Sequence, residues 1–353
     1  MLEKNNNFDI NENETQSSED EVCETSSILY KIIQEEYKIK KDIRRLGVIV
    51  GIPTICISVI GYIWSFVYVF LTTNVAGMTF DEAVNFSQNP AMQQILQIIV
   101  SCLMFLLPFS IAAKCAGIRI DQTVLFGKAK KGTFIPFLFF GIGFCSFANI
   151  AISYAEVIFE SFGIDYEVDF GDNPSGVFGF LLSSIATAIV PALVEEFACR
   201  GIVLSLLKKH GEGFAIISSS IIFGIMHGNF EQIPFAIMVG LILGYIYVKT
   251  NSIWPCIAVH CANNAISVIF TYLQNVMSVN MQNVLYIVYL VISLILAVFG
   301  VLMFTKNKDN SFNIEAKEDI VTQKEKYIYF FTSWAVIIFV VINFLKAFSY
   351  FVI

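Results

Sequence analysis

Charged side chains are scarce in this chain: of its 353 residues, 14% are Asp, Glu, Lys or Arg, whereas 56% are hydrophobic. Histidine is rarer still, with three residues in the whole sequence. A composition this apolar excludes an ordinary soluble domain, in which about a quarter of the residues are charged. It is typical of a polytopic membrane protein.

Signatures of several enzyme classes are also missing. The eight cysteines show no C-x-x-C spacing, and there is no Gly-rich phosphate loop and no H-E-x-x-H motif. The sequence therefore does not indicate nucleotide binding through such a loop, and it does not indicate the metalloprotease chemistry of soluble zincins. We expect the cysteines to be small apolar core residues. No nucleic-acid partner is predicted.

Long apolar runs dominate the sequence instead. About nine of them approach the roughly 20 residues that a helix needs to span a hydrocarbon core of about 30 Å. They predict an all-α fold, a polytopic transmembrane bundle of about nine helices. The fifth and sixth runs are short and nearly contiguous, so we expect a tight helical hairpin. The runs lie at 46–72, 92–113, 133–159, 177–206, 213–230, 232–249, 252–272, 283–304 and 327–352.

The basic residues predict how the bundle is oriented. Of the 22 Lys and Arg residues, all but Arg200 and Lys346 lie in or beside segments that nine crossings would place on one side of the membrane. Basic residues are retained on the cytoplasmic side of short loops. We therefore expect a multi-pass protein of the cell membrane with its N-terminus inside and its C-terminus outside.

We divide the chain into four parts. Residues 1–45 are predicted to be cytoplasmic, with an acidic, disordered tail poor in large apolar residues before a basic juxtamembrane segment. The segment 31–45 either forms an amphipathic helix at the lipid headgroups or anchors the first membrane helix. Residues 46–129 hold N-terminal transmembrane helices, 130–275 the core with the polar motifs, and 276–353 C-terminal transmembrane helices. No cleavable signal peptide is expected, because the first apolar segment starts late and is too long for one.

Polar and ionisable side chains interrupt three of the apolar runs. A charge near the middle of a bilayer costs at least about 2.5 to 3.5 kcal/mol, so such residues usually mark a site. They could also be interhelical hydrogen-bond partners, a bridge that specifies the fold, or a transporter's proton relay. The residues concerned are Glu195, Glu196, Arg200, His227, His260 and Asn264.

Helical spacing gives the two adjacent glutamates separate tasks. Glu196 and Arg200 are i,i+4 neighbours, so the guanidinium can neutralise and orient that carboxylate. Glu195 points about 100° away and can face a cavity as a base or a ligand. Pro191 is expected to kink the helix and free backbone carbonyls toward the bundle interior. At a rise of about 1.5 Å per residue, the polar groups of the three runs overlap in depth, so one mid-membrane site is geometrically feasible.

Three motifs in this part of the chain resemble those of a known family. They are E-E-x-x-x-R (Glu195 to Arg200), F-x-x-x-H (Phe223 to His227) and H-x-x-x-N (His260 to Asn264). In order and spacing they are similar to the motifs of the CAAX prenyl endoprotease and bacteriocin-processing (CPBP, Abi-type) family of intramembrane proteases. The resemblance covers roughly residues 130–275, and every motif position matches.

The resemblance implies peptide hydrolysis within the membrane. By carry-over from the family, Glu195 looks like the general base that activates water. Glu196 and Arg200 look like its supporting ion pair, and His227 looks like its partner in holding that water. Such a residue set supplies the base and the water-positioning group that a hydrolase needs.

The resemblance leaves two mechanisms open for the remaining residues. His260 and Asn264 would stabilise the oxyanion in a metal-free, glutamate-dependent reaction. Alternatively, Glu195, His227 and His260 would bind a divalent metal, for which zinc is the expected ion, with one position open for water.

The expected function is that of an intramembrane endopeptidase of the CAAX type, acting on a membrane-embedded or lipid-associated peptide or protein in the lipid bilayer. The alternative from another class is a non-proteolytic membrane transporter, or a bacteriocin-immunity or binding protein, that uses the same polar site. An inverted repeat with interrupted helices in both halves would favour a transporter. The polar interruptions occur only in the runs between 177 and 272.

Overall fold

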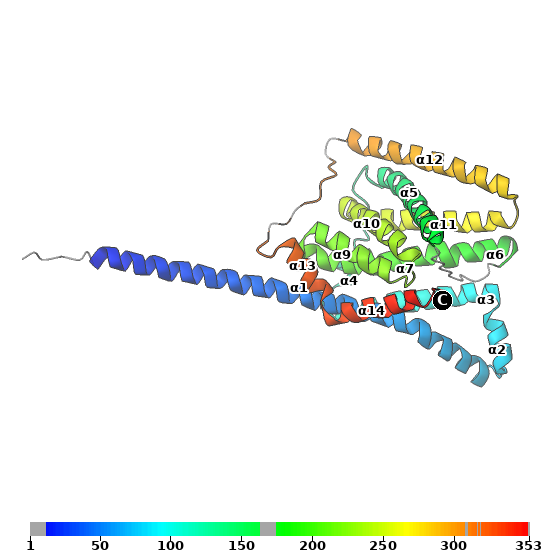
Figure 1. The fold of residues 1–353 in the computed structure, drawn as a ribbon, viewed down its shortest axis with the longest axis horizontal. Helices are drawn as coiled ribbons and strands as arrows, with labels where there is room; N and C mark the ends of the chain where they lie inside the picture. Colours follow the sequence, from blue (N-terminus) through cyan, green and yellow to red (C-terminus); the bar gives the residue numbers. More distant parts are fainter. Residues whose placement is uncertain (1–11, 163–173, 308–309, 316, 318, 352–353) are drawn as a thin grey trace, which may run out of the picture.

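All secondary-structure elements of the described residues are helices, as the apolar runs predict (Figure 1). The computed structural model describes residues 12–162, 174–307, 310–315, 317 and 319–351. The hydrocarbon core of a bilayer offers no water to backbone groups, so a spanning segment must satisfy them internally, and a helix does so. The predicted all-α bundle is confirmed.

The N-terminal part of the chain forms four helices. They are α1 (Glu12–Asn74), α2 (Phe80–Ser87), α3 (Pro90–Cys115) and α4 (Ile120–Thr123). The first half of α1 extends beyond the bundle (Figure 1). The acidic tail was predicted to be disordered, but the structure is helical from Glu12 onward, and positions 1–11 lie outside the described residues. Between Glu12 and Leu46 the sequence has no Pro or Gly to stop a helix that its apolar half has started.

The middle of the chain supplies the helices that carry the motifs. After α5 (Phe134–Ser161), one long apolar run is divided by π-type turns at η1 and η2. Its pieces are α6 (Gly176–Ser183), η1 (Ser184–Ile189), α7 (Val190–Glu196), η2 (Phe197–Leu204), α8 (Ser205–Leu207) and η3 (Lys208–His210). The other motifs lie in or beside α9 (Glu212–Ile225), α10 (Gln232–Thr250) and α11 (Trp254–Gln274). The chain continues with α12 (Val279–Lys306), α13 (Gln323–Phe331) and α14 (Trp334–Phe348).

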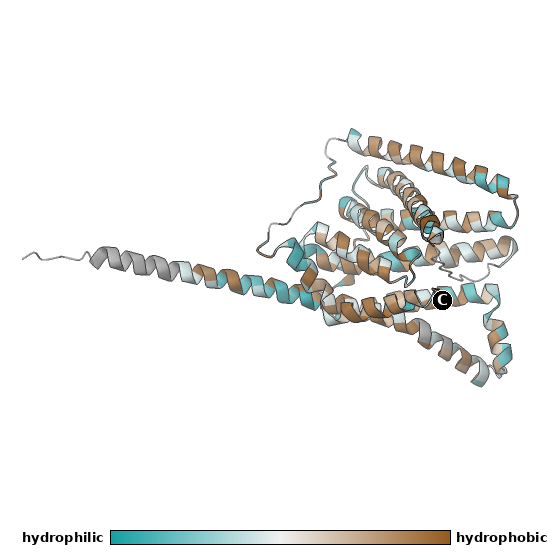
Figure 2. Ribbon diagram, viewed as in Figure 1, coloured by the Kyte–Doolittle hydropathy of each residue, from teal (hydrophilic) through white to brown (hydrophobic). Residues whose placement is uncertain are grey.

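Each of the nine apolar runs coincides with helix, but not all of these helices can cross a membrane alone. Within the described residues, seven are long and apolar enough, or eight if α13 and α14, which are bent by 70°, form one broken span. The helix α9 has only 14 residues, about 21 Å at 1.5 Å per residue. It ends before Gly228, whose φ of +64° turns the chain into α10. Figure 2 shows hydrophobic residues along most of the long helices and hydrophilic ones gathered toward their ends.

Segments that were predicted to be cytoplasmic meet at one end of the bundle. The Asp42 carboxylate lies 2.6 Å from Lys209 Nζ and 2.9 Å from His210 Nε2. The buried Lys326 ammonium donates to the His210 carbonyl at 2.8 Å and pairs with Asp319 at 3.1 Å. This cluster holds α1 and α13 against the end of the motif-bearing helices. The third histidine of the chain therefore lies in this cluster, and the side of the membrane on which the cluster lies stays a prediction.

The helices α9 and α10 pack closely because each has a glycine where the other helix approaches. A Cβ added to Gly224 would lie 2.3 Å from Ile237 Cγ1, and one added to Gly240 would lie 2.9 Å from Ser220 Cβ. This close approach brings the Gly240 carbonyl within 3.2 Å of Arg200 Nη2. Packing between these two helices thus contributes to the position of the first motif.

Candidate active site

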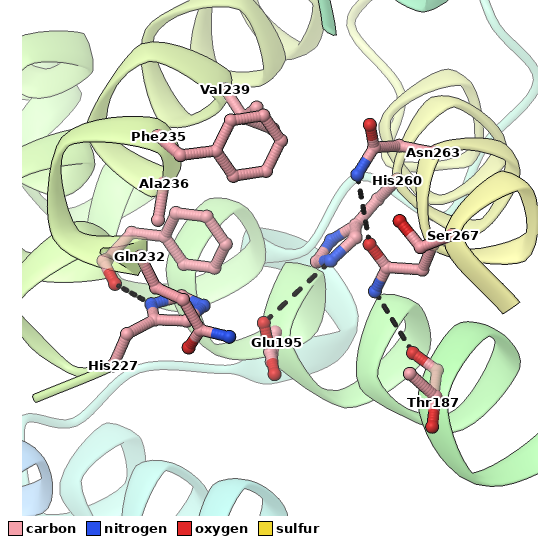
Figure 3. A pocket seen from close by; sticks show the side chains of 12 residues that line it. Thr187, Glu195, His227, Gln232, Phe235, Ala236, Val239, His260, Asn263 and Ser267 are labelled. Atoms are coloured by element: carbon pink, nitrogen blue, oxygen red, sulfur yellow. Dashed lines mark hydrogen bonds and ion pairs between the residues drawn. The ribbon is translucent and has the colours of Figure 1, made fainter. Parts of the chain in front are cut away.

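One cavity of about 240 Å³ brings residues of all three motifs together (Figure 3). Of the six predicted residues, Glu195, His227, His260 and Asn264 line it, whereas Glu196 and Arg200 lie behind its wall, 0% and 1% exposed. The full lining is Thr187, Glu195, Phe223, His227, Gln232, Phe235, Ala236, Val239, His260, Asn263, Asn264 and Ser267. The single site anticipated from helix depth is thus present as a geometric feature.

The helix that carries both glutamates is irregular on each side of them. Pro191 is the second residue of α7, which follows the π-type segment η1, and a second π-type segment, η2, begins at Phe197. Proline lacks the N–H that would bond the carbonyl four residues earlier, which is that of Thr187. This carbonyl accepts a hydrogen bond from Asn264 Nδ2 at 3.0 Å. As predicted, a carbonyl before Pro191 turns to a partner inside the bundle, and π-type turns are frequent at functional sites.

The Glu196–Arg200 pair forms as its spacing predicts. Arg200 Nη1 donates to Glu196 Oε1 at 2.8 Å, and the guanidinium carbon lies 4.6 Å from the centre of the Phe223 ring. With the bond to Gly240, the cation has a carboxylate, a carbonyl and an aromatic face as partners. Partners of this kind offset the cost of burying a charge, which is large when the charge is left alone.

In both site histidines, Nδ1 is hydrogen-bonded within the protein and Nε2 is the ring nitrogen that is left. His227 Nδ1 lies 2.9 Å from the Phe223 carbonyl, which can only accept, so Nδ1 carries the proton. His260 Nδ1 lies 2.8 Å from Glu196 Oε1 and donates to that carboxylate in the same way. In each neutral ring Nε2 is then the acceptor. His260 Nε2 lies 3.9 Å from Glu195 Oε2.

The amide of Asn264 is engaged at both ends. Its Nδ2 donates to the Thr187 carbonyl at 3.0 Å, and its Oδ1 accepts from Asn263 Nδ2 at 3.1 Å. Asn263 in turn accepts from Asn149 Nδ2 at 3.5 Å. The predicted oxyanion role of Asn264 stays a prediction, and in this structure the side chain ties α11 to η1.

Four polar residues of the cavity wall were not predicted, namely Thr187, Gln232, Asn263 and Ser267. Asn263 adjoins a motif residue, and Gln232 is a polar residue at the start of an otherwise apolar run, which was a usable signal. Thr187 and Ser267 resemble ordinary helix-packing residues in the sequence.

The predicted metal ligands have only part of the usual geometry of a metal site. A histidine that donates Nδ1–H to a carbonyl or carboxylate and keeps Nε2 as a lone pair has the usual arrangement of a metal ligand. Among the residues that the structure describes, however, no three His, Cys, Asp or Glu side chains are close enough together to hold a metal ion. The set Glu195, His227 and His260 does not fit a metal in this arrangement, and the zinc site stays a prediction.

Comparison with known proteins agrees with the motifs. The family model for "Type II CAAX prenyl endopeptidase Rce1-like" proteins matches residues 177–266, a segment that contains all six predicted site residues. The "Putative membrane peptidase YdiL" of Bacillus subtilis (strain 168) is 33% identical over 89 residues, which are 25% of this chain and 36% of that protein. The match thus spans about a third of the relative's length. No solved structure matches the chain. The chain is thus a multi-pass membrane protein, and the order of the three motifs, their convergence on one cavity and these two matches support its resemblance to the CAAX prenyl endoprotease and bacteriocin-processing family.

Proposed function

We propose that the protein is an intramembrane endopeptidase that hydrolyses a peptide bond of a membrane-embedded or lipid-associated substrate. The observation that carries the proposal is the convergence of Glu195, His227 and His260, from three separate segments, on one cavity inside an apolar bundle. The match to the Rce1-like model over the same segment supports a peptidase.

In the proposed reaction, Glu195 is the general base. Its side chain is 16% exposed, in contrast to the fully buried Glu196. Glu195 takes a proton from a water molecule, and the water oxygen forms a bond to the carbonyl carbon of the peptide while the carbonyl π electrons move to its oxygen. When the tetrahedral intermediate collapses, the C–N bond breaks, and the proton passes from Glu195 to the leaving amine. The Nε2 atom of His227 accepts a hydrogen bond from the water.

The buried residues behind the cavity act by positioning. Arg200 pairs with Glu196, and Glu196 fixes His260 by accepting a hydrogen bond from its Nδ1–H. His260 then presents Nε2 beside Glu195. Other hydrolytic sites likewise combine a base that activates the nucleophile, here Glu195, with buried groups that orient the side chain beside it, here Glu196 acting on His260.

The cavity also has an apolar wall that suits a membrane substrate. Phe235, Ala236 and Val239 of α10 line it together with the polar groups of α7 and α11. Ligand sites are usually lined by apolar side chains with a few polar groups that fix orientation. We therefore expect apolar residues on at least one side of the cleaved bond.

The test is cleavage of membrane-associated peptides by the purified protein in detergent. Wild type is compared with Glu195→Gln and His227→Ala, and with Glu231→Gln as a matched control. Glu231 is an acidic residue next to α10 that does not line the cavity. We expect wild type and Glu231→Gln to cut and the two site variants to be folded and inactive.

A chelator arm separates the two mechanisms. Loss of cleavage on chelation, with recovery on added zinc, would assign the metal-dependent mechanism. Unchanged cleavage would assign the metal-free mechanism. If wild type cuts nothing, or Glu195→Gln cuts equally well, the peptidase proposal fails, and transport, immunity or binding becomes the better account.

A further inference from the structure

Gln232 is a cavity residue that none of the three motifs contains, and its neighbour Asn229 fixes the orientation of its amide. The main-chain N–H of Gln232 donates to Asn229 Oδ1 at 2.8 Å. A main-chain N–H can only donate, so the Asn229 atom that meets it is the oxygen. The other end of that amide, Nδ2, is then a donor, and it lies 3.0 Å from Gln232 Oε1.

The atom of Gln232 that is left for the cavity is its amide nitrogen. Because Asn229 Nδ2 donates, the Gln232 atom that it meets must be the oxygen, and Nε2 with its two N–H groups points the other way. In Figure 3 the Gln232 side chain extends beside His227 toward Glu195, with its amide nitrogen on the side of Glu195. Asn229 is 5% exposed, so the two hydrogen bonds between Asn229 and Gln232 are sheltered from water.

The contrast with Asn264 decides which amide is better placed as a donor to substrate. Asn264 uses its oxygen on Asn263 and one of its two N–H groups on the Thr187 carbonyl, which fixes the amide toward η1. Gln232 uses its oxygen on Asn229, and among the described residues neither of its two N–H groups has a partner, so both are available to the cavity. A donor that is held in place before the reaction, in a site with little water, is the kind that stabilises developing charge best.

We propose that the Gln232 amide is the oxyanion donor of this site, a catalytic residue outside the family motifs, and that Asn229 is its positioning residue. The inference rests on the proposed peptidase function. Attack of water places a negative charge on the carbonyl oxygen of the substrate, and Gln232 Nε2–H donates a hydrogen bond to that oxygen without giving up its proton. The bond strengthens as charge develops, so it acts mainly on kcat.

The experiment compares Gln232→Met, Gln232→Glu and Gln97→Ala with wild type in the peptide-cleavage assay. Methionine keeps the length of the side chain and removes the donor, whereas glutamate places an acceptor where the oxyanion forms. Gln97 lies in another apolar helix, α3, and does not line the cavity. Loss of one oxyanion donor lowers kcat by about 10²- to 10³-fold. We expect that loss for Gln232→Met, with a smaller change in KM, a greater loss for Gln232→Glu, and wild-type kinetics for Gln97→Ala.

Asn229→Asp supplies the second variant. The aspartate oxygen still accepts the main-chain N–H of Gln232 but no longer donates to Gln232 Oε1, so kcat should fall while the fold is retained. Binding of a phosphinic peptide, whose tetrahedral oxygen mimics the oxyanion, should weaken in Gln232→Met much more than binding of a cleaved product peptide. A purely structural role would weaken both equally.

The outcomes separate the two proposals. If wild type cleaves and Gln232→Met, shown to be folded by its unfolding temperature, keeps wild-type kcat, the inference is overturned and the peptidase function stands. Equal weakening of both ligands in Gln232→Met would also overturn it. If wild type cleaves no peptide, the peptidase function itself fails and takes the inference with it.

Discussion

Replacement of Arg200 by methionine tests whether the buried ion pair stabilises the core. The guanidinium is 1% exposed and bonds to Glu196 at 2.8 Å and to the Gly240 carbonyl at 3.2 Å. Methionine fills much of the same space but leaves the Glu196 carboxylate, which is 0% exposed, without a cation. Removing one partner of a buried pair costs about 3 to 5 kcal/mol, because the other charge is left uncompensated. We expect Arg200→Met to lower the free energy of unfolding by about that amount.

Arg119 supplies the matched control. It pairs with Asp121 at 2.9 Å, nearly the same distance, but the two side chains are 68% and 67% exposed. Exposed pairs contribute about 0 to 1 kcal/mol, so Arg119→Met should have little effect. Unfolding is measured by titration with a denaturing detergent and followed by circular dichroism. The double variant Glu196→Gln/Arg200→Met buries neither charge and should recover part of the loss.

Two results would refute this reasoning. A cost below about 1 kcal/mol for Arg200→Met would mean that the pair behaves like an exposed one. A double variant less stable than Arg200→Met alone would mean that the uncompensated carboxylate is not the source of the loss.

The remaining predictions concern packing and acid stability. Gly224→Ala should destabilise the protein by about 1 to 3 kcal/mol in the same titration, because the added Cβ would lie 2.3 Å from Ile237 Cγ1. Gly213→Ala on the same helix meets nothing within 4 Å and should be neutral or stabilising; a loss there equal to that of Gly224→Ala would contradict the packing account. Burial raises the pKa of Asp319, but the hydrogen bond and the charge of Lys326, the charge of Lys317 and a backbone hydrogen bond from Ile320 together outweigh it and hold the pKa below the ordinary 3.8. Since the folded pKa is the lower one, this stabilisation is present above pH 3.8 and is lost as pH falls through the folded pKa. Asp319→Asn should therefore be less stable than wild type at pH 7, and the gap should close in acid; a gap independent of pH would refute the assignment.

Much of the helical architecture could be predicted from the sequence, because a membrane permits few alternatives. Each apolar run forms helix, and the i,i+4 spacing of Glu196 and Arg200 gives the observed ion pair. The crossing count could not be fixed in the same way. It depends on where α9 ends and on the bend between α13 and α14, which occurs at Thr332 and Ser333, whose hydroxyls bond to backbone carbonyls.

The parts of the site that escaped prediction depend on side-chain partners that spacing does not reveal. Asn264 lies in a motif, yet its amide is bonded to Thr187 and Asn263. Gln232 looks in the sequence like a polar residue at a helix end, and only the contact with Asn229 shows how its amide is held. Spacing predicts the face on which a residue lies, whereas hydrogen-bond partners decide which of its atoms remain for a substrate.

The two neighbouring glutamates illustrate how one helix can separate stability from chemistry. Glu196 Oε1 accepts from both Arg200 and His260 at 2.8 Å and is closed to the cavity, whereas Glu195 lines the cavity, and its Oε2 lies 3.9 Å from His260 Nε2. A neutral substitute at position 196 leaves Arg200 as a buried cation without its carboxylate. It also weakens the hydrogen bond that holds the His260 ring beside Glu195. A neutral substitute at position 195 leaves every one of these bonds intact. Loss of cleavage without loss of stability is therefore expected of Glu195→Gln and not of Glu196→Gln, even though the two side chains differ by a single step along the chain.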